Sequence, residues 1–191
     1  MVKEIWLYFE GHKSLREGFR QFFARLPDPP RIRLVAGCGR EQTMRDFVRG
    51  IRDHQESLVL LLVDLDGADP ADLCAQLRTR AASLDPQSQV HFMVQVMEAW
   101  FLADRQALRD FYGPGLQEGR LPGNPQVEGI PKQVVLKGLQ LATRKAGKGA
   151  YHKTRHAPKL LGRLNPQRVA AAAPHCRALL ETLGKVAAVR Q

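Results

Sequence analysis

Four short apolar segments, each followed by a segment with helical spacing, constrain the fold of this 191-residue chain more than any other feature. The apolar segments are rich in β-branched and aromatic residues and are bounded by turn residues, which is typical of β-strands. They cover residues 4–9, 31–36, 57–63 and 89–97. Apolar residues with helical spacing follow at 14–26, 41–54, 70–82 and 98–112. Strands that alternate with helices predict an α/β fold with a mostly parallel sheet.

Acidic residues stand at the ends of three of these predicted strands. Glu10 follows the first strand, and Asp64 and Asp66 follow the third. Glu98 follows the fourth. Because ligands bind at the carboxyl ends of parallel strands, we expect the four carboxylates to gather at one edge of the sheet. Clustered carboxylates repel one another unless a cation lies between them, and their oxygens suit Mg²⁺ or Mn²⁺.

The spacing of Asp64 and Asp66 supports a metal site. In an extended chain, residues two apart point to the same side, so both carboxylates face one way and Leu65 faces the core. Each acid also has a simpler interpretation. Aspartates are common turn residues, and an acid at a helix N-terminus, as expected for Glu10 and Glu98, interacts favourably with the helix dipole.

The charge of the chain is distributed very unevenly. Residues 1–130 contain 16 Lys and Arg against 18 Asp and Glu, whereas residues 131–191 contain 13 Lys and Arg and one acid, Glu181. A Gly- and Pro-rich stretch at 113–130 predicts a linker. We therefore expect a metal-binding domain at 1–112 and a basic helical C-terminal lobe at 131–191, packed on or next to it. This asymmetry favours a nucleic-acid partner, although a solubility surface would have the same charge.

A short stretch of the predicted lobe combines basic residues with an aromatic residue and two glycines. Its candidate nucleic-acid-binding residues are Lys145, Lys148, Tyr151, Lys153, Arg155 and Lys159. Basic and aromatic side chains on a loop are typical of contacts with a phosphate backbone and its bases. The alternative is an exposed basic linker without a ligand.

Other function classes find little support. No apolar segment approaches the roughly 20 residues that cross a bilayer, and the first residues lead directly into a strand rather than a signal peptide. The three cysteines, Cys38, Cys74 and Cys176, fit neither a disulfide framework nor a zinc site. A cytoplasmic location is therefore expected.

The glycine-containing loop at 37–39 and Asp104 lead to two further predictions. The loop at 37–39 could bind phosphate through main-chain N–H groups, but it matches no nucleotide-binding motif. Asp104 lies within the last predicted helix of the first domain. We expect it to be a solvent-facing acid or a surface partner of Arg105 or Arg109.

Several motifs occur in an order that resembles a known family. They are Glu10-Gly11, Asp64-Leu65-Asp66, the string from Glu98-Ala99-Trp100 to Asp104, Tyr151-His152-Lys153, and Leu160-Leu161 with Leu164. This order resembles the TOPRIM domain of topoisomerases, primases and OLD-family nucleases. It is closest to a TOPRIM-like family of bacterial proteins, domain-of-unknown-function family 4276. The resemblance implies a three-layer TOPRIM-like fold whose acids bind a divalent metal for phosphodiester chemistry.

The resemblance also bears on function. The leading hypothesis is a Mg²⁺- or Mn²⁺-dependent nuclease in which Glu10, Asp64 and Asp66 hold the metal and Glu98 completes or flanks the catalytic site. Family members often have a second acid after the first glycine, where this chain has residues 12–14, His-Lys-Ser. That departure favours a catalytically silent nucleic-acid-binding subunit. The resemblance further implies a phage-defence system and an ATPase partner, so a regulatory partner of an ATPase is a third hypothesis.

Overall fold

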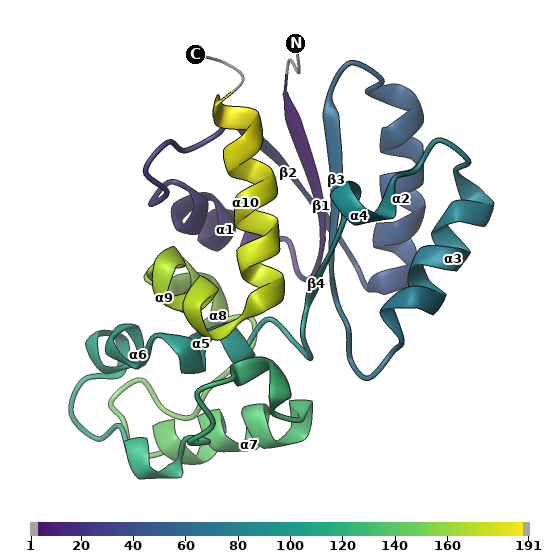
Figure 1. The fold of residues 1–191 in the computed structure, drawn as a ribbon. Coiled ribbons are helices and arrows are strands. Elements are labelled where there is room, and N and C mark those ends of the chain that lie inside the picture. Colours follow the sequence, from purple (N-terminus) through teal and green to yellow (C-terminus); the bar gives the residue numbers. More distant parts are fainter. Residues whose placement is uncertain (1–3, 189–191) are drawn as a thin grey trace.

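A computed structural model describes residues 4–188 of the chain (Figure 1). Residues 1–3 and 189–191, at the outer ends of the two predicted domains, lie outside the described part. The strands are β1 (Ile5–Glu10), β2 (Ile32–Gly37), β3 (Leu58–Asp64) and β4 (Val90–Met93). The α-helices are α1 (Leu15–Phe23), α2 (Arg40–Asp53), α3 (Pro70–Arg80), α4 (Pro86–Gln89), α5 (Ala99–Ala103), α6 (Arg105–Tyr112), α7 (Lys132–Thr143), α8 (Ala157–Leu161), α9 (Pro166–Ala172) and α10 (Pro174–Ala188). Two short 3₁₀ helices, η1 (Glu118–Arg120) and η2 (Val127–Gly129), lie between α6 and α7.

The four strands form one parallel sheet in the order β2-β1-β3-β4. Leu7 of β1 lies opposite Leu34 of β2 on one side and Leu60 of β3 on the other. The predicted α/β class with a parallel sheet is therefore confirmed. Because every strand runs in the same direction, all four carboxyl ends meet at one edge.

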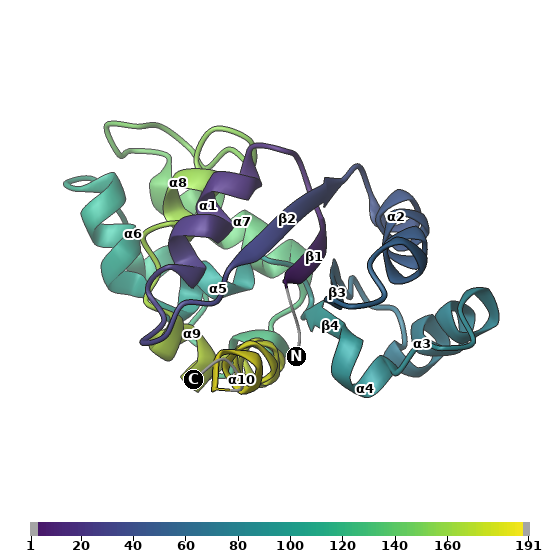
Figure 2. The ribbon, with the colours of Figure 1, turned by 90° about the horizontal axis from the view of Figure 1, so that it is seen from above.

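Helices cover both faces of the sheet, which gives three layers (Figure 2). Alternate residues of β1 point to opposite faces: Leu7 and Phe9 pack with α1 and the C-terminal helices, whereas Tyr8 packs with α2. β3 is buried from Val59 onward, as its continuous run of apolar residues requires of a central strand covered on both faces.

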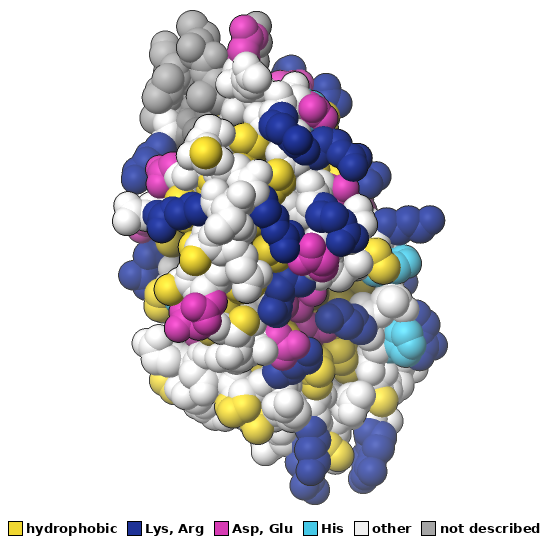
Figure 3. Space-filling view, turned by 90° about the vertical axis from the view of Figure 1, so that its right-hand side faces the viewer, with side chains coloured by type: hydrophobic (Ala, Val, Ile, Leu, Met, Phe, Trp, Pro, Cys, Tyr) yellow, Lys and Arg dark blue, Asp and Glu magenta, His cyan; other side chains and the backbone are white. Residues whose placement is uncertain are grey.

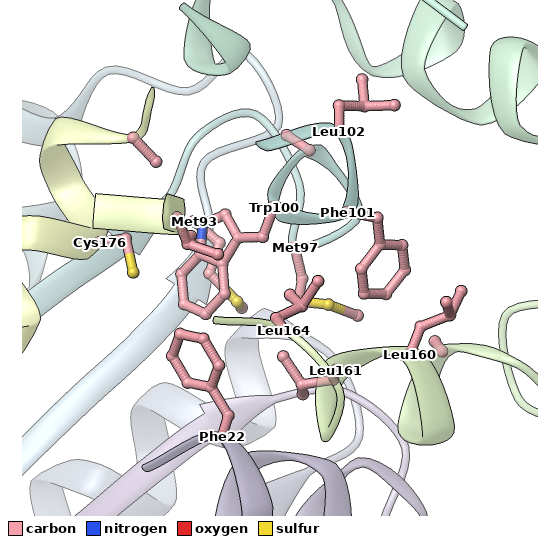
Figure 4. Close-up of a cluster of buried hydrophobic side chains, with 14 of the residues drawn as sticks. Phe22, Met93, Met97, Trp100, Phe101, Leu102, Leu160, Leu161, Leu164 and Cys176 are labelled. Carbon is pink, nitrogen blue, oxygen red and sulfur yellow. The ribbon is translucent and has the colours of Figure 1, made fainter. Parts of the chain in front are cut away.

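The C-terminal helices are part of the same hydrophobic core as the sheet. α8 packs against α1, and α10 packs against β4. The side chains that meet between them are shown in Figure 4 and include Phe22, Met93, Met97, Trp100, Leu160, Leu161, Leu164 and Cys176. Helices α8, α9 and α10 thus complete the layer of helices on one face. The division of the chain into domains at 112 and 131 stays a prediction.

The fourth strand is shorter than the sequence pattern predicts. β4 ends at Met93, and residues 94–97 form a loop rather than continuing the strand to 97. The carbonyl groups of Met93 and Gln95 accept hydrogen bonds from the N–H groups of Leu65 and Asp66, at 3.0 and 2.8 Å. The apolar residues of this loop are buried against the end of β3, so hydrophobicity alone did not mark the end of the strand.

The predicted helix over 98–112 is two helices that are broken at Asp104. The Asp104 side chain is buried, so the expectation of a solvent-facing acid was wrong. It accepts hydrogen bonds from the N–H of Ala107 (3.4 Å), the N–H of Asn165 (2.9 Å) and Nη1 of Arg168 (2.8 Å). Its partners thus lie in the next turn and at the start of α9, not on arginines of its own helix. The helical spacing of apolar residues continues through the break and hides it.

Candidate functional site

The four predicted acids all lie at the carboxyl edge of the sheet. Glu10 and Asp64 are the last residues of β1 and β3, and Asp66 lies in the turn after β3. Glu98 directly precedes α5. Glu98 and Glu10 both raise the pKa of Asp64, and Asp66 raises the pKa of Glu10, so each acid lies in the field of at least one other. The topology therefore brings the acids to one place.

Asp64 is at the centre of this cluster. Its side chain is buried, and Oδ1 accepts a hydrogen bond of 2.9 Å from the N–H of Met97. Burial raises the pKa of Asp64 to about 7, and the charges of Glu98 and Glu10 add to that effect. Lys153 and the hydrogen bond from Met97 act in the opposite direction. A carboxyl group that resists ionisation in this way is stabilised by any cation placed beside it.

Glu98 is the most deeply buried of the four acids, with no exposed surface, and does not lie at the rim of the site. Its Oε1 accepts a hydrogen bond of 3.0 Å from the Tyr151 hydroxyl and lies 3.6 Å from Nζ of Lys153. Its Oε2 is buried and has no hydrogen-bond partner. A buried carboxylate oxygen without a partner is costly, so this atom is open to a further hydrogen-bond donor or a cation.

Tyr151 differs from the expectation of an aromatic ring that faces a nucleic acid. It is buried, its hydroxyl donates to Glu98, and its N–H donates to the Thr143 hydroxyl at 2.7 Å. Burial, followed by the charge of Glu98, raises the pKa of Tyr151. Tyr151 therefore holds the loop between α7 and α8 against the acids.

Glu10 lies beside Arg40, the first residue of α2. Nε of Arg40 is 3.8 Å from Oε2 of Glu10, and neither atom has a hydrogen-bond partner. Burial raises the pKa of Glu10, and the charge of Arg40 partly offsets that rise. Nη2 of Arg40 donates to the carbonyl oxygens of Asp64 and Leu65, at 2.8 and 3.1 Å. Sequence analysis did not identify Arg40, although its place after the glycine loop at 37–39 was a signal.

Asp66 is the exposed member of the cluster. Its backbone φ of 46° lies in the left-handed region, so the extended geometry that predicted a shared face with Asp64 does not apply. Leu65 nevertheless points into the core, as expected. Oδ2 of Asp66 lies 2.7 Å from Nζ of Lys132, the first residue of α7. Sequence analysis did not identify Lys132 either, and no local motif marks it.

The side chains of these four acids are of the type that binds a divalent metal, but their positions in this structure are not those of a metal site. The ligands would be hard carboxylate oxygens, and Glu10 and Glu98 each have a buried oxygen without a hydrogen-bond partner. Yet among residues 4–188 no three His, Cys, Asp or Glu side chains are arranged to hold a metal ion. Basic side chains partner three of the four acids instead. A metal site therefore requires movement of these side chains.

Five of the six predicted nucleic-acid-binding residues are exposed: Lys145, Lys148, Lys153, Arg155 and Lys159. Lys153 connects this group with the acids through Glu98, and Lys148 lies 5.3 Å above the ring of Phe111. Figure 3 shows Lys and Arg side chains gathered around acidic ones near the middle of one face of the molecule. A basic surface that surrounds acidic groups suits a phosphate-rich ligand.

Fold and site together define an α/β protein with an acidic cluster at the carboxyl edge of a parallel sheet. The sequence matches the family described as "Domain of unknown function (DUF4276)" over residues 12–184, so the chain belongs to that family. The matched range contains Asp64, Asp66 and Glu98, and Glu10 lies just before it. No curated protein and no solved structure matches the chain. Among the helices within residues 4–188, none is long and apolar enough to cross a membrane.

Proposed function

We propose that this protein is a Mg²⁺- or Mn²⁺-dependent nuclease that hydrolyses phosphodiester bonds. The observation that carries the proposal is the fully buried Glu98, whose Oε2 lacks a partner, in the field of a second buried carboxyl group, Asp64. Two buried carboxyl groups in one another's field are unfavourable unless a proton or a cation is present. The resemblance to TOPRIM domains of OLD-family nucleases supports the same chemistry, and a role in bacterial phage defence is part of the proposal.

The residues have distinct roles in this proposal. Glu10, Asp64 and Asp66 hold the cation, and Glu98 completes the site from its buried position. A bound cation supplies a lowered pKa for water and neutralises charge on the phosphate. Glu10 is also a candidate general base, because burial raises its pKa. The exposed basic residues, of which Lys153 is nearest to the acids, hold the nucleic-acid backbone.

A second candidate is favoured by the ion pairs. Arg40, Lys132 and Lys153 neutralise Glu10, Asp66 and Glu98 without any metal. A site that is balanced in this way suits a catalytically silent nucleic-acid-binding subunit, or a regulatory partner of an ATPase. Both alternatives predict no cleavage at any metal concentration.

Cleavage assays on the full chain separate these functions. We expect cleavage of single-stranded or double-stranded DNA or RNA with Mg²⁺ or Mn²⁺ and none with EDTA. Asp64→Asn and Glu98→Gln should lower the rate by about 10- to 100-fold, the range for loss of a group that supports a catalytic metal. Asp72→Asn, on the exposed side of α3, is the matched control and should cleave at the wild-type rate. Wild-type rates in folded Asp64→Asn protein would contradict the proposal.

A further inference from the structure

Two lysines pair with the acids from parts of the chain that follow the sheet. Nζ of Lys132 lies 2.7 Å from Oδ2 of Asp66, and Nζ of Lys153 lies 3.6 Å from Oε1 of Glu98. The lysine side chains are 34% and 53% exposed. Both ammonium groups can therefore turn towards solvent. The pair of Lys132 with Asp66 is partly exposed at both ends and is therefore weak. The pair of Lys153 with Glu98 is exposed only at its lysine end, and the buried carboxylate keeps the hydrogen bond from Tyr151 when the lysine leaves.

Arg40 behaves differently from these lysines. Its Nη2 is fixed by the carbonyl oxygens of Asp64 and Leu65. Glu98 is also fixed without Lys153, because the Tyr151 hydroxyl donates to the same carboxylate. Arg40 and Glu98 therefore keep their positions when the lysine ammonium groups move away.

Both lysines lie in the field of several acids at once. Asp66, Asp64 and Glu98 all raise the pKa of Lys132, the hydrogen bond with Asp66 having the largest effect. Lys153 lowers the pKa of both Asp64 and Glu10. When all groups are ionised, four carboxylates face three basic side chains, which leaves one excess negative charge. A divalent cation turns this into one excess positive charge, and a net positive site attracts phosphate.

We propose that Lys132 and Lys153 exchange partners during binding. In the cation-free protein they neutralise Asp66 and Glu98, and when a divalent cation takes over the carboxylates they bind phosphate groups of the nucleic acid. The proposal rests on the metal site of the proposed function and adds Lys132 as a phosphate ligand. It also predicts that cation and nucleic acid each strengthen the binding of the other, because such coupling is reciprocal.

The test compares Mn²⁺ binding and oligonucleotide binding in the same full-length variants. Free Mn²⁺ is followed by electron paramagnetic resonance, and binding of a cleavage-resistant, phosphorothioate single-stranded DNA is followed by fluorescence anisotropy. The variants are Lys132→Met, Lys153→Met and the double substitution. Lys137→Met is the matched control, since Lys137 is an exposed residue of the same helix as Lys132. Circular dichroism confirms that each variant is folded.

We expect wild-type protein to bind the oligonucleotide more tightly with Mn²⁺ than without it. Lys132→Met should raise the Mn²⁺ affinity by about two- to five-fold, the range for one half-exposed ion pair. Lys153→Met should raise it at least as much, because the carboxylate that it leaves is fully buried. The double variant should lose the coupling between the two ligands. Lys137→Met should keep it. Unchanged or weaker Mn²⁺ binding by the double variant, or intact coupling, would overturn the exchange while leaving the metal site standing. Failure of wild-type protein to bind Mn²⁺ would overturn the proposed function and the exchange together.

Discussion

At the scale of single residues, Asp64 shows how tertiary position changes the chemistry of a carboxyl group. It ends the central strand β3, where the layers of helices on both faces exclude water. It retains one strong partner, the N–H of Met97. Burial therefore dominates over that hydrogen bond, and the pKa of Asp64 rises from 3.8 to about 7. A proton or a cation is needed to satisfy this residue at neutral pH.

This shift makes a prediction about stability and pH. The folded protein holds the Asp64 proton more tightly than the unfolded chain does. The protonated side chain therefore contributes to the free energy of unfolding, fully below about pH 4, and this contribution is lost as pH rises through about 7. Asp64→Asn removes the charge and retains an oxygen that can accept from the N–H of Met97. In cation-free buffer its free energy of unfolding should exceed that of wild type by a difference that grows with pH, to at most about 4 kcal/mol.

Urea denaturation from pH 4 to 8 measures this difference, with Asp72→Asn as control. Excess Mn²⁺ should reverse the order, because the cation stabilises only the protein with intact carboxylates. A difference that does not vary with pH would show that Asp64 is ionised at no cost in the folded protein.

At the scale of elements, Asp104 connects three helices. It ends α5, caps α6 through the N–H of Ala107, and accepts from Asn165 and Arg168 at the start of α9. α5 follows Glu98 directly, so this connection also supports the position of the buried acid. The side chain of Arg168 is 54% exposed while that of Asp104 is 4% exposed, so most of the desolvation falls on the carboxylate.

We expect Asp104→Ala to destabilise the protein by about 2–4 kcal/mol, because a helix cap and a buried charged hydrogen bond are lost together. Arg168→Ala should cost less, about 1 kcal/mol, since the backbone N–H groups still satisfy Asp104. A double-mutant cycle by thermal or urea denaturation isolates the ion pair. Equal costs for the two single substitutions would show that the arginine, rather than the cap, is the main contact.

At the scale of the whole molecule, charge is separated along the sequence but mixed in space. The basic residues between 131 and 188 belong to helices and loops that share one hydrophobic core with the sheet. Lys132 and Lys153 reach acids of the first part of the chain. The acids at the carboxyl edge of the sheet therefore lie next to basic side chains of the C-terminal part of the chain. An arrangement of this kind can attract a polyanion and bring it to the carboxylates.

We predict that nucleic-acid affinity is mainly electrostatic and depends on the loop between α7 and α8. Replacing Lys148, Lys153 and Arg155 together with alanine should weaken binding, and each lost phosphate contact should reduce the log–log salt slope by roughly 0.7 to 0.9. A second triple variant serves as the control. It replaces Arg45, Arg49 and Arg52 of α2 with alanine and so removes the same amount of charge from a different part of the molecule. Fluorescence anisotropy over a salt series measures both slopes. If the two variants weaken binding equally, only the net charge matters and the loop is an ordinary solvated surface.

The sequence by itself determined the α/β class, the parallel sheet and the strand-end positions of Glu10 and Asp64. These follow from local periodicity, because strands and helices bury apolar residues with different spacing. The left-handed backbone of Asp66, the early end of β4 and the break at Asp104 did not follow from it, since each depends on hydrogen bonds with residues distant in the chain. Packing likewise decided the burial of Glu98 and Tyr151. It also decided which basic residues pair with the acids, namely Arg40, Lys132 and Lys153. Acids alone predicted a metal site, and only the tertiary structure revealed the basic side chains that balance it, because charge compensation acts through space rather than along the sequence.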